Sequence, residues 1–246
     1  MPSFRALLFN IYMYVLTAVT IIVCFPALIL PAKLIQKIIN IWARWVLAGL
    51  RVIAGLSYEI RGNEHIPHGA ALYAVKHQSM WETIALLAIL HSPAIVLKQE
   101  LTRIPMYGQF TKKAGMVSVD RNAQAKALRT MISDCRRRLK EGRPVVIFPE
   151  GSRSEPGTKL RYKPGVAGLY AELNIACIPV ALNSGLYWPR HSLQFRTGTI
   201  QIEFLPPIEP GLNRKAFMSE LECRIEDTAT RLHKAGLATL CEEQTA

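Results

Sequence analysis

The stretch "ALYAVKHQSMWETIALL", residues 71–87, combines two local patterns. Residues 71–75 form a short apolar run of strand length, and the residues after it turn into an amphipathic helical pattern. Ser79, followed three places later by Glu82 and ahead of an apolar run, matches the capping box of a helix N-terminus. The stretch therefore predicts a strand that leads into a helix, with His77 near the junction.

Two interpretations of His77 and Glu82 are open at this point. In one interpretation, His77 is a catalytic base and Glu82, five places later, is the carboxylate that orients it. In the other interpretation, Ser79 caps the helix, Glu82 bonds back to it, and His77 is an ordinary loop residue. Short motifs match by chance, so the rest of the chain has to decide.

The alternation of strand and helix continues along the chain. Strand patterns occur at 71–75, 94–97, 116–119, 144–148, 177–182 and 199–205. A helix of about 123–141 follows the third strand pattern, and a last amphipathic helix covers about 214–234. This order predicts an α/β fold with a mostly parallel central sheet flanked by helices.

The N-terminal quarter has a different character. No charged residue lies between Arg5 and Lys33, so this run exceeds the roughly 20 apolar residues that cross a bilayer. The next segment repeats apolar residues at helical spacing and carries cationic side chains and two tryptophans, which suits the membrane interface. We therefore predict an N-terminal two-helix membrane-embedded segment at 1–57, and a folded domain at 58–246. Whether the first helix spans the bilayer or re-enters one leaflet stays open, and the positive charge downstream favours the cytoplasmic side for the domain.

The charge balance indicates an anionic partner. The 246 residues include 30 Lys and Arg against 18 Asp and Glu, a net charge of +12. Such an excess suits lipid head groups, phosphorylated substrates or nucleic acid. Because the basic residues are dispersed and no recognised module is present, we do not expect nucleic-acid binding.

Cysteine and histidine spacing gives no sign of a metal or redox site. The five cysteines are scattered and are expected to be reduced, buried thiols. Five of the six histidines lack a companion ligand cluster, so no metal site is predicted: His65, His68, His91, His191 and His233. No glycine-rich nucleotide motif is present, so no ATP or dinucleotide cofactor is expected.

Polar residues follow the ends of four predicted strands. These residues are Lys76-His77, Lys98, Asp120-Arg121 and "PEGSRS" at 149–154. In open α/β sheets, reactive groups gather beyond the carboxyl ends of the strands. Arg153 offers a planar fork for phosphate oxygens, and backbone N–H groups near Gly151 can face an anion. Each feature alone also has an ordinary explanation, since Pro-Glu-Gly-Ser is common turn chemistry and Lys98 or Arg121 could be surface residues.

Four segments together resemble a known family. "HQSMWE" (77–82), "GMVSVDR" (115–121), "FPEGSRS" (148–154) and "ACIPVAL" (176–182) resemble, in order and spacing, the four blocks of the glycerolipid acyltransferases. The 1-acyl-glycerol-3-phosphate acyltransferases are the most similar group. The resemblance covers about residues 58–210, and the family's membrane-embedded N-terminus fits residues 6–56. The family has Asp where this chain has Glu82, and usually Thr where it has Ser152.

The resemblance implies acyl transfer from acyl-CoA or acyl-carrier protein to a glycerophosphate hydroxyl, giving phosphatidic acid without a cofactor. It implies that His77 is the general base and Glu82 its orienting carboxylate. The residues implied in substrate binding are Lys98, Arg121, Glu150, Gly151, Ser152 and Arg153. Direct transfer is favoured over an acyl-enzyme, because no cysteine lies near a block and Ser79 is better explained as a cap.

Two alternatives remain. The same chemistry could act on glycerol-3-phosphate, a lyso-ornithine lipid or another lysophospholipid. The chain could also be a non-catalytic, basic protein bound to an anionic membrane surface, although that function does not explain the four segments together.

Overall fold

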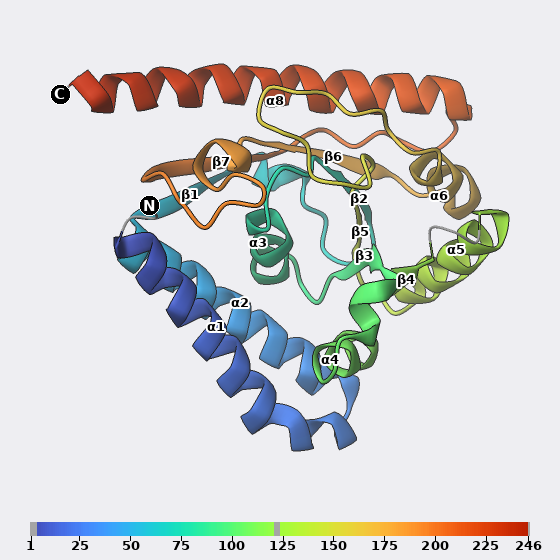
Figure 1. Ribbon diagram of the computed structural model, residues 1–246. Helices are drawn as coiled ribbons and strands as arrows, with labels where there is room; N and C mark the ends of the chain where they lie inside the picture. Colours follow the sequence, from blue (N-terminus) through green and yellow to red (C-terminus); the bar gives the residue numbers. More distant parts are fainter. Residues whose placement is uncertain (1–3, 121–123, 246) are drawn as a thin grey trace.

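The chain folds around a seven-stranded sheet with helices on both faces (Figure 1). The computed structural model describes residues 4–120 and 124–245. The strands are β1 (Leu56–Arg61), β2 (Leu72–Val75), β3 (Ala94–Lys98), β4 (Val117–Val119), β5 (Val145–Ile147), β6 (Cys177–Leu182) and β7 (Gly198–Phe204). The α-helices are α1 (Phe4–Cys24), α2 (Ala32–Ala54), α3 (Trp81–Ile89), α4 (Tyr107–Lys113), α5 (Gln124–Lys140), α6 (Gly165–Leu173), α7 (Ser184–Tyr187) and α8 (Arg214–Thr245). Short 3₁₀ helices are η1 (Phe25–Ile29), η2 (Asn63–His65) and η3 (Gln99–Arg103).

The sheet order is β1-β7-β6-β2-β5-β3-β4. The five strands from β6 to β4 are parallel, which confirms the predicted mostly parallel sheet. β7 runs antiparallel to β6, and β1 pairs with β7 in parallel. β1 was not predicted from the sequence. It is an edge strand whose residues are mostly exposed or half-buried, so it lacks a continuous apolar run.

Alternate residues of β2 point into two separate cores. Leu72 and Ala74 pack with residues of α5, α6 and α8, whereas Tyr73 and Val75 pack with residues of α1, α2 and α3. Figure 1 shows this layering, with α8 along one side of the sheet and α1 and α2 along the other. The period-2 alternation of a fully buried strand thus produces a three-layer α/β/α arrangement.

The N-terminal helices form a hairpin that packs on the domain. Pro26 lies at the start of η1 and Pro31 is the N-cap of α2, so both prolines lie at the turn of the hairpin. The helical segment 4–29 is long and apolar enough to cross a membrane by length and composition. Large apolar side chains of α1 are exposed: Phe4, Leu7, Leu8, Ile11, Tyr14, Val15, Val19, Ile22 and Val23.

The other face of α1 is held by the domain. The ring of Phe9 contacts Trp188 at 5.8 Å and Phe195 at 5.2 Å between centroids. The side-chain amide of Asn10 donates to the carbonyl of Leu193 at 3.2 Å. The hairpin is therefore packed against the loop between α7 and β7.

Two expectations need correction. Cys135 and Cys177 are buried as expected, but Cys223 and Cys241 on α8 are exposed, because the helix covers the sheet with one face only. α8 also continues to Thr245 and does not stop near residue 234. Within this helix, a Cβ at Gly236 would lie 2.9 Å from Leu186 Cδ1, so the absence of a side chain permits close packing against α7.

Candidate functional site

The carboxyl ends of β2, β5, β3 and β4 lie side by side at one edge of the sheet. Leu72 of β2 and Ala94 of β3 both pair with Val145 of β5, so Lys98 is level with Lys76 along the strands. With β5 between them, the two strands are about 10 Å apart. The sequence-predicted groups that follow these strands therefore share one edge.

His77 and Glu82 are directly hydrogen-bonded. His77 follows β2, and Glu82 lies in the first turn of α3. His77 Nδ1 is 2.8 Å from Glu82 Oε1, which also accepts the backbone N–H groups of Gln78 and Ser79, both at 2.7 Å. The extra methylene of Glu82 relative to the family's Asp is thus accommodated without loss of the contact.

The capping interaction is present as well. Glu82 accepts the N–H of Ser79, and Ser79 Oγ accepts the N–H of Trp81 at 3.2 Å. α3 begins at Trp81 with Met80 at the N-cap, one residue later than the sequence pattern placed it. The two interpretations of the motif are therefore compatible, because one carboxylate serves both the helix start and the imidazole.

Ser184 is a further partner of Glu82 that the sequence did not indicate. Its hydroxyl donates to Glu82 Oε2 at 2.7 Å from the first residue of α7, after β6. Glu82 is fully buried, and its two oxygens together have four polar partners. The carboxylate has a fixed position, as a group that orients an imidazole requires.

The ring of His77 is held on its face too. It stacks on Phe148, with centroids 4.1 Å apart and planes inclined by 21°. Its side chain is 15% exposed. Within the described part of the chain, Nε2 makes no hydrogen bond, so the nitrogen opposite Glu82 is available to a substrate.

The turn 149–154 lies directly against His77. Gly151 has φ +70°, a backbone conformation that favours glycine. The backbone N–H of Ser154 donates to the carbonyl of His77 at 2.7 Å, and its hydroxyl does so at 3.1 Å. Ser152 is exposed and Arg153 half-buried. Because Ser154 is bonded to His77, the adjacent Arg153 is fixed in the same neighbourhood.

Arg190 is a second cation next to this turn. Its guanidinium donates to the carbonyl of Arg153 at 2.7 Å, from the loop that follows α7. No sequence pattern had singled it out. It adds positive charge beside Arg153.

The remaining predicted residues have different surroundings. Lys98 is exposed at the end of β3. Glu150 is buried, with Oε1 2.8 Å from Lys76 Nζ and Oε2 2.9 Å from the backbone nitrogen of His77. Both of its oxygens face protein groups. Arg121 lies outside the described residues.

Burial raises the pKa of Glu150, and Lys76 together with the hydrogen bonds at the carboxylate opposes that rise. Because the net result is a raised pKa, the effect of burial on Glu150 is larger than the opposing effects of Lys76 and the hydrogen bonds.

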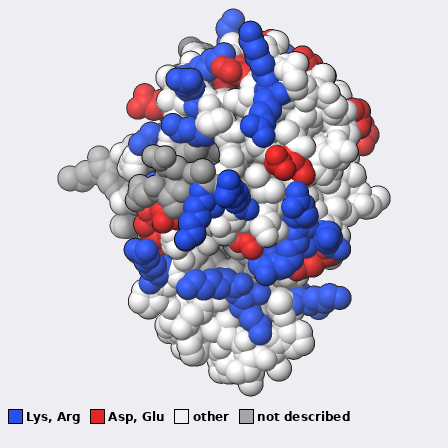
Figure 2. Space-filling model, turned by 90° about the vertical axis from the view of Figure 1, so that its right-hand side faces the viewer, with Lys and Arg blue, Asp and Glu red and all other residues white. Residues whose placement is uncertain are grey.

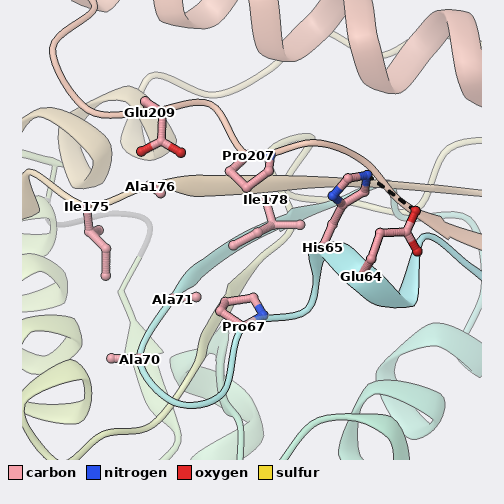
Figure 3. A pocket seen from close by; sticks show the side chains of 10 residues that line it. All are labelled: Glu64, His65, Pro67, Ala70, Ala71, Ile175, Ala176, Ile178, Pro207 and Glu209. Atoms are coloured by element: carbon pink, nitrogen blue, oxygen red, sulfur yellow. Dashed lines mark ion pairs between the residues drawn. The ribbon is translucent and has the colours of Figure 1, made fainter.

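A cavity of about 370 Å³ lies at the other end of the sheet (Figure 3). Its lining includes Ala71 and Ala176, which lie just before β2 and β6, and also Glu64 and His65. The distance between Glu64 Oε1 and His65 Nε2 is 3.7 Å. Because β2 and β6 are parallel, this cavity is at the edge opposite His77. Among the residues that the structure describes, no group of three or more His, Cys, Asp or Glu could hold a metal ion.

Basic side chains are spread over the face that carries α5 (Figure 2). The last turn of α5 contributes Arg137, Arg138 and Lys140, and Arg137 and Arg138 pair with Asp134 and Glu141. Arg137 is thus a solvated, ion-paired surface residue, whereas the Arg138 side chain is only 15% exposed.

Comparison with known proteins agrees with this geometry. The sequence pattern of the family described as "Acyltransferase" matches residues 57–183, which include His77, Glu82 and the 149–154 turn. The chain belongs to the acyltransferase family. This membership confirms the resemblance seen in the four segments.

Individual relatives are more specific. The chain is 32% identical to a 1-acyl-sn-glycerol-3-phosphate acyltransferase of Pseudomonas aeruginosa, over 82% of this chain and 79% of the relative. It is 26% identical to a protein of the same name from Limnanthes alba, over 81% and 76%. Its fold matches the crystal structure of a 1-acyl-sn-glycerophosphate acyltransferase from Thermotoga maritima, with a TM-score of 0.78, 22% identity, and coverage of 94% and 98%.

Proposed function

We propose that this protein transfers an acyl chain from a thioester donor to the free hydroxyl of 1-acyl-glycerol-3-phosphate, producing phosphatidic acid. The observation that carries the proposal is the 2.8 Å contact between His77 Nδ1 and Glu82 Oε1, beside a turn that bears Arg153. The relatives named for this reaction support the choice of acceptor. The chain is accordingly an O-acyltransferase.

The hydrogen-bond pattern supports one tautomer of His77. Glu82 Oε1 already accepts two backbone N–H groups, so it is an acceptor toward the ring as well. Nδ1 therefore carries the proton, and Nε2 of the neutral ring has a free lone pair. That lone pair is the property a general base needs.

In the proposed reaction, Nε2 takes the proton of the acceptor hydroxyl while its oxygen attacks the thioester carbonyl. The carbon–sulfur bond then breaks, and the imidazolium returns the proton to the departing thiolate, which leaves as a free thiol. Glu82 stabilises the imidazolium between these steps. General-base assistance of this kind contributes about 10²–10⁴-fold. The thioester supplies the activation, so we propose no cofactor, with acyl-CoA or acyl-carrier protein as the donor substrate.

For the acceptor phosphate, we assign Lys98 and Arg153 as the binding cations, with Arg121 as an additional one. Gly151 and Ser152 would shape the site next to them, because the positive φ of Gly151 gives the turn its form. Glu150 would act by holding the turn in place, since both of its oxygens have protein partners. Guanidinium and ammonium groups together suit the charge and geometry of a phosphate monoester.

We further propose that the hairpin of α1 and α2 attaches the enzyme to a membrane, with the domain on the cytoplasmic side. The exposed apolar side of α1 supports attachment, and the cationic residues that follow it support the orientation. Such attachment would place the enzyme where its lipid acceptor resides.

The test is acyl transfer by the purified protein. The parent and His77→Ala are assayed with acyl-CoA and acyl-carrier protein on 1-acyl-glycerol-3-phosphate, glycerol-3-phosphate, a lyso-ornithine lipid and other lysophospholipids. We expect the highest kcat/KM on 1-acyl-glycerol-3-phosphate, and loss of turnover by about 10²-fold or more in the variant. Preference for another acceptor would overturn the substrate assignment, and substantial turnover by the folded variant would overturn the role of His77.

A further inference from the structure

Lys76, the residue before His77, is a buried cation outside the proposed reaction. Its side chain is 1% exposed, although lysine is rarely fully buried unless it is paired. Nζ is 2.8 Å from Glu150 Oε1 and 3.2 Å from the carbonyl oxygen of Thr158. Because the side chain is buried and its Nζ is bonded to protein groups, Lys76 does not bind a substrate directly.

The C-terminal helix supplies the second carboxylate of this cluster. Glu226 of α8 places Oε1 2.8 Å and Oε2 3.0 Å from Lys76 Nζ. The hydroxyl of Tyr162, which is also buried, donates to Glu226 Oε1 at 2.9 Å. One ammonium group thus joins β2, the 149–154 turn, the loop at 158–162 and α8.

The cluster reaches His77 through the backbone. Glu150 uses one oxygen for Lys76 and the other for the N–H of His77 at 2.9 Å. The carbonyl of His77 accepts from Ser154, four residues after Glu150 in the same turn. Both backbone polar groups of His77 are therefore fixed by a turn whose own anchor is the ion pair with Lys76.

We infer that Glu226 and Lys76 are positioning residues for acyl transfer, through which α8 fixes both the backbone of His77 and the Arg153 turn. This inference rests on the proposed function. Glu82 orients the imidazole from one side, and the Lys76 cluster holds the main chain that carries it from the other. A displacement of about 1 Å at a reacting group can cost about 10²-fold in rate, so a rigid support of this kind has a measurable effect on kcat.

The chain offers a matched control one helical turn earlier on α8. Glu222 also pairs with a lysine of the loop, Lys159, at 2.8 Å, but the Lys159 side chain is 57% exposed. Glu222→Ala therefore removes an ion pair of the same length, but on the surface of the same helix, and leaves the contacts of Lys76 intact. Glu226→Ala removes the partner of Lys76 and Tyr162, while Glu226→Gln keeps an oxygen that can accept from either.

Steady-state kinetics is the first measurement, at a temperature well below the unfolding midpoint of every variant. We expect kcat of Glu226→Ala to fall by about 10- to 100-fold. The kcat of Glu226→Gln should fall by a smaller factor, and the kcat of Glu222→Ala should stay within about twofold of the parent value. A kcat of Glu226→Ala close to that of the parent, even with a lowered unfolding midpoint, would mean that the cluster only stabilises the fold and would overturn the inference.

Hydrogen exchange followed by mass spectrometry gives a readout that does not depend on activity. In Glu226→Ala, amides of 76–79 and 149–163 should exchange faster, because the N–H groups of His77 and Ser154 depend on the cluster. Glu222→Ala should leave 76–79 unchanged. Unchanged exchange at 76–79 in Glu226→Ala would also overturn the inference, whereas an inactive parent with the expected exchange pattern would overturn only the proposed function.

Discussion

Replacing Glu82 with Gln isolates the electrostatic role of this side chain. The amide has nearly the same shape, and its oxygen will occupy the Oε1 position because three N–H donors converge there. The amide nitrogen then faces Ser184, whose hydroxyl can accept a hydrogen bond. The tautomer of His77 is therefore retained, and only the negative charge is lost.

The size of the effect follows from the geometry. With Nδ1 and Oε1 2.8 Å apart, the charge centres of an imidazolium and this carboxylate are about 4 Å apart, which at an effective dielectric constant of about 20 gives about 4 kcal/mol. At about 1.4 kcal/mol per decade, Glu82→Gln should lower kcat by about 10³-fold. A loss of about 10⁴-fold in kcat would instead indicate that the variant holds His77 in the other tautomer, with the proton on Nε2.

The assay is chromatographic quantification of phosphatidic acid formed from acyl-CoA under saturating substrate. The unfolding midpoint of the variant serves as the control for folding. A loss of less than tenfold in a folded Glu82→Gln protein would refute the reasoning, because it would mean that no imidazolium develops beside this carboxylate.

Three further predictions concern Ser184, Arg153 and the thiols. Ser184→Ala removes one charge-assisted hydrogen bond that holds Glu82 in position; because a displacement of about 1 Å near a reacting group can cost about 10²-fold, kcat should fall by about tenfold or more, and unchanged kcat would contradict this role. Arg153→Ala should chiefly raise the KM for the phosphorylated acceptor, and an unchanged KM would remove it from phosphate binding. Burial raises the pKa of Cys135 to about 12 and also raises that of Cys177, so at pH 8 both remain protonated, and a thiol reagent should modify the exposed Cys223 and Cys241 before them. Fast modification of Cys135 in the folded protein would contradict the buried position.

Local sequence patterns were sufficient for the parallel part of the fold. β2, β5 and β6 are apolar and buried along their whole length, so their runs stand out against the polar turns around them. β1 was not predicted because its residues, which include Ser57, Glu59 and Arg61, are mostly exposed or half-buried and form no apolar run. The antiparallel direction of β7 also could not be predicted, since strand direction depends on packing partners and not on composition.

The candidate site shows the same division between local and distant contacts. His77 and Glu82 are five positions apart, so their contact follows from the strand–helix junction itself. Ser184 is 102 positions from Glu82, and Glu226 is 150 positions from Lys76. Nothing in the local sequence of these residues distinguishes them; the pairing of β6 with β2 brings Ser184 to Glu82, and the packing of α8 on the sheet brings Glu226 to Lys76.

The packing of the N-terminal hairpin has a mechanical consequence. Phe9 is buried against Trp188 and Phe195, and Arg190, in the same loop, donates to the carbonyl of Arg153. In the membrane attachment that we propose, these direct contacts between α1, the loop after α7 and the 149–154 turn would set the height of His77 above the bilayer surface. A shortened chain without α1 would therefore lose the proposed anchor and also the packing of Phe9 and Asn10 against the loop that carries Arg190.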